Sequence, residues 1–189
     1  MSKIIAVEYM SLDGIVEDPG PTGEFRHRGW TMPYWSDDLG TAQGDLLFGS
    51  EALLLGRVTY EEFLAAWPSR SGDPFSDKIN SMPKYVASRS LKGPLEWNAT
   101  LLKGEVPTAV RKLKDQAKGD LLIYGSGDLV TTLTQHKLID MYRMMLYPVA
   151  LGSGERYFKE TDDKVSLKLK SATATTSGVV ILDYEAAKI

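Results

Sequence analysis

The sequence predicts a single three-layer α/β domain built on a mixed sheet. Apolar segments alternate with helix-like segments along most of the chain, which is the order expected when helices join the strands of a sheet. Two of the apolar segments stop at a glycine and open directly into a helix. The end of the chain changes to a period of two, which indicates an antiparallel hairpin. With 189 residues and 43% hydrophobic content, the whole chain, residues 1–189, suits one well-buried domain.

The first elements follow from apolar runs and a helix-start signal. Residues 4–10 are mostly apolar and predict a buried strand. Residues 18–33 are rich in Gly, Pro, Arg and Trp and predict a long loop. Long ordered loops in compact domains more often have a function than not. Ser36 is followed by two acids, so a helix is predicted over 36–48. The leucine run at 53–55 predicts the second strand.

The middle of the chain is predicted as one helix, a loop and two strands. A helix over 58–66 is closed by Trp67 and Pro68. Residues 69–83 are polar and are expected to form a loop. Strands are predicted at 84–88 and 98–102.

The last elements return to helix spacing and end in a hairpin. Pro107 suits the start of a helix, because apolar residues recur at helical spacing from Val106 to Ala117. The sequence then predicts a strand over 121–124, a helix over 128–135 and a strand over 139–149. The two arms of the hairpin are predicted over 165–175 and 179–184.

The composition excludes several classes of function. The chain has 22 basic and 25 acidic residues, so nothing suggests a nucleic-acid or membrane partner. It has no cysteine, which excludes disulfides, thiolate metal sites and cysteine nucleophiles. His27 and His136 lack partners at ligand spacing, so no metal site is expected. Glu8 interrupts the first apolar run too early for a signal peptide, and no run has the length of a membrane span. We therefore expect a cytoplasmic protein.

The strongest functional signal is a pair of strand–glycine–helix junctions. The first is Leu55-Gly56-Arg57-Val58-Thr59 and the second is Tyr124-Gly125-Ser126-Gly127-Asp128-Leu129. Such a turn directs free backbone N–H groups and the positive end of a helix dipole at one point, where phosphate binds well. In the first junction, Arg57 can grip a terminal phosphate and Thr59 can add a hydroxyl. Two junctions suggest a nucleotide cofactor, although either alone also fits a plain tight turn.

The second junction does not fit a Rossmann unit or a Walker loop. A Rossmann fingerprint needs a third glycine where Val130 stands, and an acid about twenty residues further on. The next acid after Val130 is Asp140, which comes too early. No Gly-Lys-Ser/Thr follows, so a Walker loop is excluded.

A second arginine follows the next predicted strand, in Ser88-Arg89-Ser90. Neighbouring parallel strands place the residues that follow them at one edge of the sheet, so Arg57 and Arg89 are expected on the same edge. Two arginines beside one nucleotide suit a ribose 2′-phosphate, which favours NADPH over NADH.

Taken together, the motifs resemble the dihydrofolate reductase-like family, and most of all the reductase domain of bifunctional riboflavin-biosynthesis proteins. The resemblance covers nearly the whole chain. Its landmarks occur in the family's order, and they are Ser11-Leu12-Asp13-Gly14, Leu55-Gly56-Arg57-Val58-Thr59-Tyr60-Glu61, Ser88-Arg89-Ser90, Gly125-Ser126-Gly127 and Pro148-Val149-Ala150-Leu151-Gly152-Ser153-Gly154.

The resemblance implies an eight-stranded, mostly parallel sheet with a C-terminal hairpin, which binds NADPH at the carboxyl ends of its strands. In such proteins the glycine–arginine turn and the serine–arginine–serine segment hold the 2′-phosphate, and the late glycine turn holds the pyrophosphate. The first strand and its turn lie beside the nicotinamide, which gives this role to the segment from Val7 through Gly14 to Ile15.

Two further residues are candidates for the substrate end of the site. Dihydrofolate reductases carry a catalytic carboxylate on the first long helix, and Asp38 lies near that position. An acid in a first helical turn is equally explained by the helix dipole. Trp35 stands at the junction of loop and helix and could stack on a planar substrate, or it could cap the core beneath the loop.

The sequence therefore predicts an NADPH-dependent reductase that transfers hydride to a planar heterocycle. A pteridine or a 5-amino-6-ribosylaminouracil-like compound is the expected substrate class. The phosphosugar-binding motif of the riboflavin-pathway reductases is absent, so a non-catalytic nucleotide-binding protein with the same fold is the alternative. Related reductase domains commonly pair, and we expect a homodimer.

Overall fold

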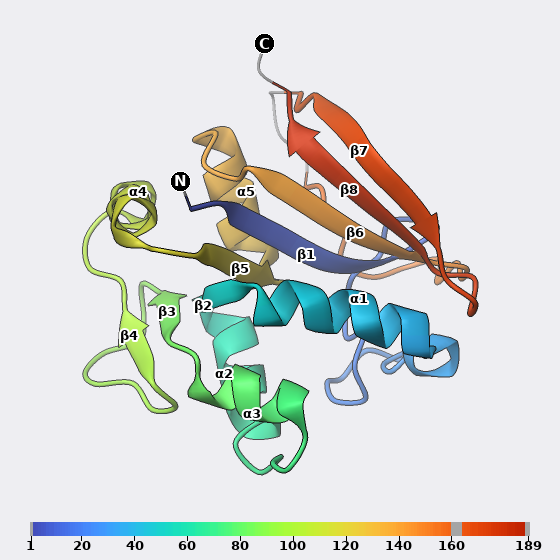
Figure 1. Cartoon of the computed structure of the whole chain (residues 1–189), viewed down its shortest axis with the longest axis horizontal. Coiled ribbons are helices and arrows are strands. Elements are labelled where there is room, and N and C mark those ends of the chain that lie inside the picture. The colour runs from blue at the N-terminus through green and yellow to red at the C-terminus, as the bar shows by residue number, and fades with distance from the viewer. Residues whose placement is uncertain (1, 160–163, 188–189) are drawn as a thin grey trace. The chain divides into compact units, whose positions relative to one another are not determined.

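The computed structural model describes residues 2–159 and 164–187. Within them, eight strands form one sheet in the order β4-β3-β2-β5-β1-β6-β8-β7. The strands are β1 (Ile4–Ser11), β2 (Ser50–Gly56), β3 (Lys84–Ala87), β4 (Ala99–Leu101), β5 (Asp120–Tyr124), β6 (Met141–Tyr147), β7 (Leu167–Ala174) and β8 (Val180–Ala186). Strand β2 pairs in parallel with β3 and β5, whereas β8 pairs antiparallel with β6 and β7. The mixed, mostly parallel sheet with its C-terminal hairpin is confirmed (Figure 1).

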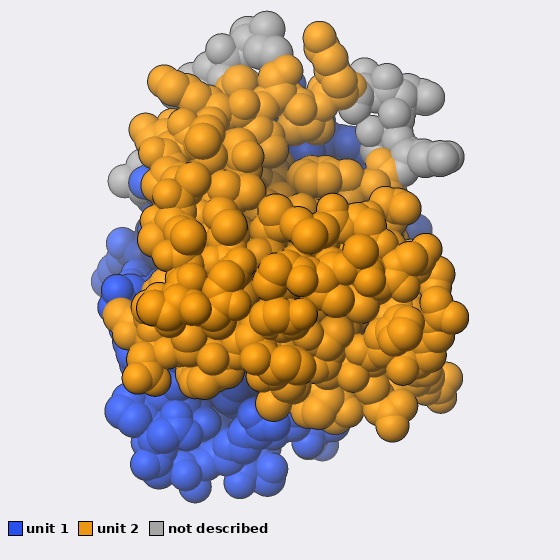
Figure 2. All heavy atoms as spheres, turned by 90° about the vertical axis from the view of Figure 1, so that its right-hand side faces the viewer, with its two compact units in different colours: residues 1–6, 44–140 blue, residues 7–43, 141–189 orange. Residues whose placement is uncertain are grey.

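The helices occur between the strands, as predicted for an α/β chain. They are η1 (Met32–Tyr34), α1 (Asp37–Phe48), α2 (Arg57–Ala66), α3 (Pro74–Ser81), α4 (Val106–Gln116) and α5 (Gly127–Gln135). The chain divides into two compact units, which Figure 2 colours separately. Unit 1 comprises Met1–Ala6 and Gly44–Asp140, and unit 2 comprises Val7–Gln43 and Met141–Ile189.

Unit 1 contains the parallel strands β2 to β5. Leu53, Leu54 and Leu55 of β2 are fully buried, as expected for a parallel strand covered on both faces. Helix α2 packs against β2 and β3, and α5 packs against β2. Helix α2 begins directly after β2, and α5 begins after two residues that follow β5, so their first turns lie at the carboxyl ends of these strands.

Unit 2 contains the antiparallel strands and an aromatic cluster. Arg143 of β6 makes two hydrogen bonds to the carboxylate of Asp183 on β8, at 2.7 and 2.9 Å. Tyr147, at the end of β6, is 2% exposed, and its ring meets the edges of three aromatic rings. One of these rings belongs to Trp30, which is buried, so this part of the long loop packs as core.

Two predicted elements differ from the structure. The loop predicted over 69–83 contains α3, because Asp73 accepts a hydrogen bond from the Ser76 N–H at 3.0 Å and Pro74 occupies the first helical turn. The strand predicted over 139–149 is shorter, since β6 ends before Pro148, which has no N–H to donate.

In the described residues, no helix has the length and apolar character to cross a bilayer.

Candidate functional site

Two neighbouring strands of unit 1 end together, and each is followed by an arginine motif. In the parallel pairing of β2 with β3, Gly56 lies opposite Ala87. Arg57 therefore follows β2 at the level where Ser88-Arg89-Ser90 follows β3. The predicted placement of both arginines at one sheet edge agrees with this register.

The third motif follows β5 at the same edge. Leu53 of β2 lies opposite Leu122 of β5. Counting three residues along both parallel strands brings Gly56 level with Gly125. The three motifs thus stand side by side at the carboxyl ends of β3, β2 and β5, where open α/β sheets bind their ligands.

Hydrogen bonds join the two glycine junctions directly. The Gly56 N–H donates to the Ser126 hydroxyl at 3.0 Å, and the Ser126 N–H donates to the Thr59 hydroxyl at 3.2 Å. Gly125 and Ser126 both have left-handed backbones, with φ of 53° and 59°. The Thr59 side chain, predicted to reach a phosphate, is buried and accepts this bond from the neighbouring turn.

The start of α5 leaves backbone donors for an anion. The Val130 N–H is bonded to the Ser126 carbonyl at 3.0 Å, which is the first bond of the helix. The N–H groups of Gly127, Asp128 and Leu129 precede this bond and belong to the first turn of the helix. Together with the helix dipole, they make this end of α5 suitable for phosphate.

The two arginines differ in their present partners. Arg57 forms an ion pair with Glu61 one turn along α2, at 2.7 Å, and the two side chains are 45% and 46% exposed. Arg89 is exposed in a turn that the Ser88 hydroxyl holds by accepting the N–H groups of Ser90 and Leu91. Both guanidinium groups are therefore reachable from solvent.

These residues fit a nucleotide that carries a pyrophosphate and a further phosphate. The exposed arginines provide fork-shaped donors for a dianion, and the first turn of α5 provides backbone donors for a second one. In the described residues, no group of His, Asp or Glu side chains has the arrangement needed for a metal ion.

In unit 2, the residues assigned to the nicotinamide lie in β1 and its turn. Val7 and Ile15 are each 1% exposed, and the Ile15 backbone is bonded to Ser11, whose hydroxyl accepts the Ile15 N–H at 2.9 Å and whose N–H donates to the Ile15 carbonyl at 3.0 Å. Gly14 has a φ of 82° and its N–H donates to the Ser11 carbonyl at 3.0 Å. Asp13 accepts the N–H of Gly152 at 2.7 Å and so ties this turn to the second glycine-rich loop of the unit.

Asp38 has contacts that oppose a role as proton donor. Its carboxylate accepts the Thr176 N–H at 2.7 Å and the Thr176 hydroxyl at 3.1 Å. Hydrogen bonds from the Ser36 hydroxyl and the Thr176 N–H lower the pKa of Asp38 to about 2. A carboxyl group with that pKa is ionised at neutral pH and has no proton to give. Asp38 instead fixes the β7–β8 turn to the start of α1.

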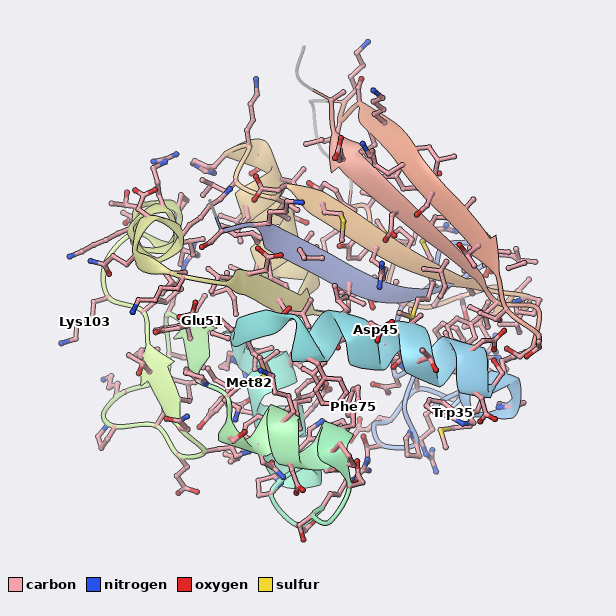
Figure 3. The ribbon with its side chains drawn as sticks, in the orientation of Figure 1. Trp35, Asp45, Glu51, Phe75, Met82 and Lys103 are labelled. Carbon is pink, nitrogen blue, oxygen red and sulfur yellow. The ribbon has the colours of Figure 1, made fainter. Side chains whose placement is uncertain are left out.

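Trp35 is open to a ligand. It lies just before α1 (Figure 3), and its side chain is 65% exposed. A Cβ added at Gly40 would come within 2.8 Å of the Trp35 ring, so the ring lies against the helix at that glycine. Trp35 therefore does not cap the core.

Glu8 is a residue of unit 2 that the sequence reasoning missed. It lies in β1, is 5% exposed, and accepts the N–H of its neighbour Tyr9 at 3.1 Å. Burial, helped by the charge of Glu155, raises the pKa of Glu8 to about 8, although the hydrogen bond from the Tyr9 N–H lowers it. The signal was available as a single carboxylate within the apolar run at residues 4–10.

Comparison with other proteins agrees with this fold. The chain is 29% identical over 187 residues to the uncharacterized protein YyaP of Bacillus subtilis (strain 168), which covers 96% of this chain and 94% of that protein. A second Bacillus subtilis protein, the uncharacterized YwjB, is 28% identical over 120 residues, covering 64% of this chain and 65% of YwjB.

Solved structures with the same fold include a putative riboflavin biosynthesis protein from Shewanella sp. PV-4. It has a TM-score of 0.79 and 21% identity, with 98% of this chain and 99% of that chain covered. The diaminohydroxyphosphoribosylaminopyrimidine deaminase/5-amino-6-(5-phosphoribosylamino)uracil reductase of Thermotoga maritima has a TM-score of 0.67 and 14% identity. There the match covers 98% of this chain and 57% of the longer protein. The family model for the RibD C-terminal domain matches residues 2–181, and the chain belongs to that family.

Proposed function

We propose that the protein is an NADPH-dependent reductase that acts on a planar heterocycle, such as a pteridine or a 5-amino-6-ribosylaminouracil-like pyrimidine. One observation carries the proposal. The register of β3, β2 and β5 brings two exposed arginines and the start of α5 to one edge of unit 1. A dinucleotide with a 2′-phosphate is the ligand class that needs both kinds of donor.

The proposed phosphate contacts divide between the two halves of this edge. Arg57 and Arg89 would hold the 2′-phosphate, with Ser88 and Ser90 as additional hydroxyl donors, because paired guanidinium groups recognise a terminal dianion. The N–H groups of residues 127–129 would hold the pyrophosphate. Gly56, Val58 and Thr59 would shape the turn between them through the hydrogen bonds to Ser126.

The proposed reacting end involves unit 2. NADPH, when bound, supplies the hydride for the reaction. The resemblance assigns Val7, Gly14 and Ile15 to the nicotinamide, and in this assignment Gly14 would face the ring while the buried Val7 and Ile15 would support the turn from beneath. Trp35 would stack on the planar substrate with its exposed ring.

Tryptophan fluorescence provides the test of the cofactor. We expect NADPH to quench the fluorescence at lower concentration than NADH, and Arg57→Ala to weaken NADPH binding about tenfold, roughly one charge-assisted contact. Arg111→Ala is the matched control, because Arg111 is an exposed arginine on α4 that follows no strand end. Equal binding of the two cofactors, unchanged by Arg57→Ala, would refute the proposal.

A second candidate function is a nucleotide-binding protein without catalysis. It is favoured by the contacts of Asp38, which remove the carboxylate expected to donate a proton. A panel of pterins, aminopyrimidine ribitols and quinones separates the two candidates. Consumption of NADPH with any of them supports the reductase, whereas tight NADPH binding with no consumption supports the binding protein.

We also propose that the protein is a homodimer. The proposal rests on the resemblance to reductase domains that pair. Light scattering coupled to size-exclusion chromatography measures the mass directly, and a monomer mass at micromolar concentration would refute it.

A further inference from the structure

Lys84 of unit 1 is the only lysine or arginine that is buried in the described part of the chain. It begins β3, and its side chain is 0% exposed. Its Nζ donates a hydrogen bond to the Asn80 carbonyl at 2.8 Å, and no carboxylate of the described residues forms an ion pair with it. Burial lowers the pKa of Lys84 to about 8, so the amine still carries its proton at pH 7. Burying a charge without an ionic partner is unfavourable, and an apolar side chain of the same length would cost less.

The Lys84 ammonium lies over the face of an indole ring. Its Nζ is 3.9 Å from the centre of the Trp97 ring, which is the geometry of a cation–π contact. The indole N–H of Trp97 donates to the side-chain oxygen of Asn80 at 2.8 Å. Asn80 therefore holds both members of the pair, the ammonium through its backbone carbonyl and the indole through its side chain.

These contacts hold Trp97 in an unfavourable backbone conformation. Trp97 and Asn98 have φ of 59° and 54°, in the left-handed region that favours glycine. Such strain persists only where the surroundings hold it. The Asn98 side chain adds to the support, because it donates to the Ser81 carbonyl at 3.0 Å. A buried charge and a strained tryptophan thus occur together, and stability alone requires neither.

Trp97 stands near the end of the segment that carries Arg89. Residues 88–98 join β3 to β4 without a helix or strand of their own. Because β3 and β4 are parallel, the segment must return from the carboxyl end of β3, where Arg89 lies, to the amino end of β4. Strand β4 is the outermost strand on this side of the sheet (Figure 1). The position of the segment therefore depends on how its two ends are held.

A further hydrogen bond connects the same end of the segment to the helix of the other arginine. The Tyr60 hydroxyl donates to the Glu96 carbonyl at 3.1 Å. Tyr60 is buried on α2, three residues after Arg57. The segment that carries Arg89 is thus fixed to α3 through Asn80 and to the helix that begins with Arg57.

We propose that Lys84 and Trp97 are positioning residues, which anchor residues 88–98 so that Arg89 reaches the same phosphate as Arg57. The inference rests on the proposed function. A guanidinium group that is already in place loses less conformational freedom on binding, so the anchor increases affinity without any new contact. Lys84 acts only through Arg89, since its side chain is buried.

Hydrogen exchange of the cofactor-free protein tests the anchor. Lys84→Met removes the charge and keeps the length of the side chain, so global stability should be kept or increased. The backbone N–H groups of residues 88–98 should nevertheless exchange about tenfold faster, the effect of losing one desolvated cation–π contact. Lys78→Met is the matched control, because Lys78 also donates to a backbone carbonyl, that of Ser50 at 2.9 Å, but is not part of the pair. Exchange of residues 88–98 at the wild-type rate in Lys84→Met overturns the proposal.

Titrations with the two cofactors then test the role. Lys84→Met should raise the Kd for NADPH about three- to fivefold, less than the removal of an arginine, and leave the Kd for NADH within about twofold. A purely structural role would raise both constants together. In a protein that already carries Arg89→Ala, Lys84→Met should not change the Kd for NADPH further, since it acts through that arginine. An undiminished effect in that background refutes the role.

The outcomes separate this proposal from the proposed function. If the wild-type protein does not bind NADPH, or Arg89→Ala binds it equally well, the proposed cofactor site fails and the positioning role fails with it, even where exchange shows the anchor. If Arg89→Ala weakens NADPH binding and Lys84→Met does not, the site stands and the role of the pair is refuted. If Lys84→Met does not fold, Trp97→Leu decides by the same two measurements, and Trp97→Phe, which keeps an aromatic face, should restore part of the NADPH affinity.

Discussion

The strand-end edge of unit 1 and the buried acid of unit 2 are built in opposite ways. The edge consists of exposed arginines, placed one or two residues after the ends of β2 and β3, and of the backbone N–H groups that begin α5 after β5. The acid is a single side chain in the middle of a strand, and its properties depend on what covers it. The first arrangement favours binding of anions, and the second favours holding a proton.

The two regions therefore respond to different physical changes. Binding at the edge depends on charge and on the geometry of turns, so it should be sensitive to salt and to substitution of arginine or glycine. The acid depends on the exclusion of water, so it should respond to pH and to changes in packing. Variants of each region should therefore leave the properties of the other unchanged.

The largest expected effect on cofactor binding comes from removing both arginines of the edge. The double variant Arg57→Ala with Arg89→Ala should weaken NADPH binding about 100-fold, roughly 2.7 kcal/mol, because two charge-assisted contacts are lost. Binding of NADH, which lacks the 2′-phosphate, should change less than about twofold. Isothermal titration calorimetry of the double variant and the wild-type protein measures the Kd for each of the two cofactors. Equal losses of affinity for NADPH and NADH would mean that the arginines do not bind the 2′-phosphate.

The next effect concerns the stability of Glu8→Gln as a function of pH. Burial raises the pKa of Glu8 from the ordinary 4.5 to about 8 in the folded protein, so the folded state keeps a proton that the unfolded state loses between these pH values. The wild-type free energy of unfolding should therefore fall as pH rises from about 4.5 to 8, by roughly 3–5 kcal/mol, and then level off. A glutamine does not titrate, so the variant should lack this fall.

Urea unfolding of both proteins at pH 4, 6 and 8 provides the measurement. The variant should gain stability relative to the wild type at each step. A difference that is the same at all three pH values would show that the folded protein does not keep Glu8 protonated.

A smaller effect is expected from Gly125→Ala. A side chain at φ 53° is strained by about 1–2 kcal/mol, and its Cβ would lie 3.4 Å from the Thr59 hydroxyl. Gly72→Ala is the control, because Gly72 has a φ of 89° with no atom near its Cβ position. Both variants should lose stability in thermal unfolding, but only Gly125→Ala should also weaken NADPH binding. Equal NADPH binding by the two variants would place the pyrophosphate elsewhere.

The smallest effect is expected from Glu61→Gln. The Glu61 carboxylate occupies Arg57 in a half-exposed pair, and releasing that arginine should strengthen NADPH binding about twofold, since such a pair is worth about 0.3–0.5 kcal/mol. The gain should shrink as salt is added and should be absent for NADH. Weaker NADPH binding in this variant would indicate that Glu61 positions Arg57 for the phosphate.

The sequence predicts the edge well because its signals are local. A glycine or an arginine directly after an apolar strand identifies its own place, and the register of β2 with β3 and β5 then brings the motifs together. Helix α3 was missed because its Asp73 cap lies within a polar stretch that lacks a long apolar pattern. The properties of Asp38 and Glu8 could not be predicted for another reason. The pKa of a carboxyl depends on its surroundings in the folded protein, which for Asp38 are the Ser36 hydroxyl and the Thr176 N–H, and for Glu8 are chiefly its burial.

The central claim is that the carboxyl ends of β3, β2 and β5 bind the phosphates of NADPH. A crystal structure of the complex with the oxidised cofactor tests it most directly. The account predicts the 2′-phosphate within hydrogen-bond distance of the Arg57 and Arg89 guanidinium groups, and the pyrophosphate at the N–H groups that begin α5. A cofactor seated away from these groups, or a 2′-phosphate in contact with neither arginine, would contradict it.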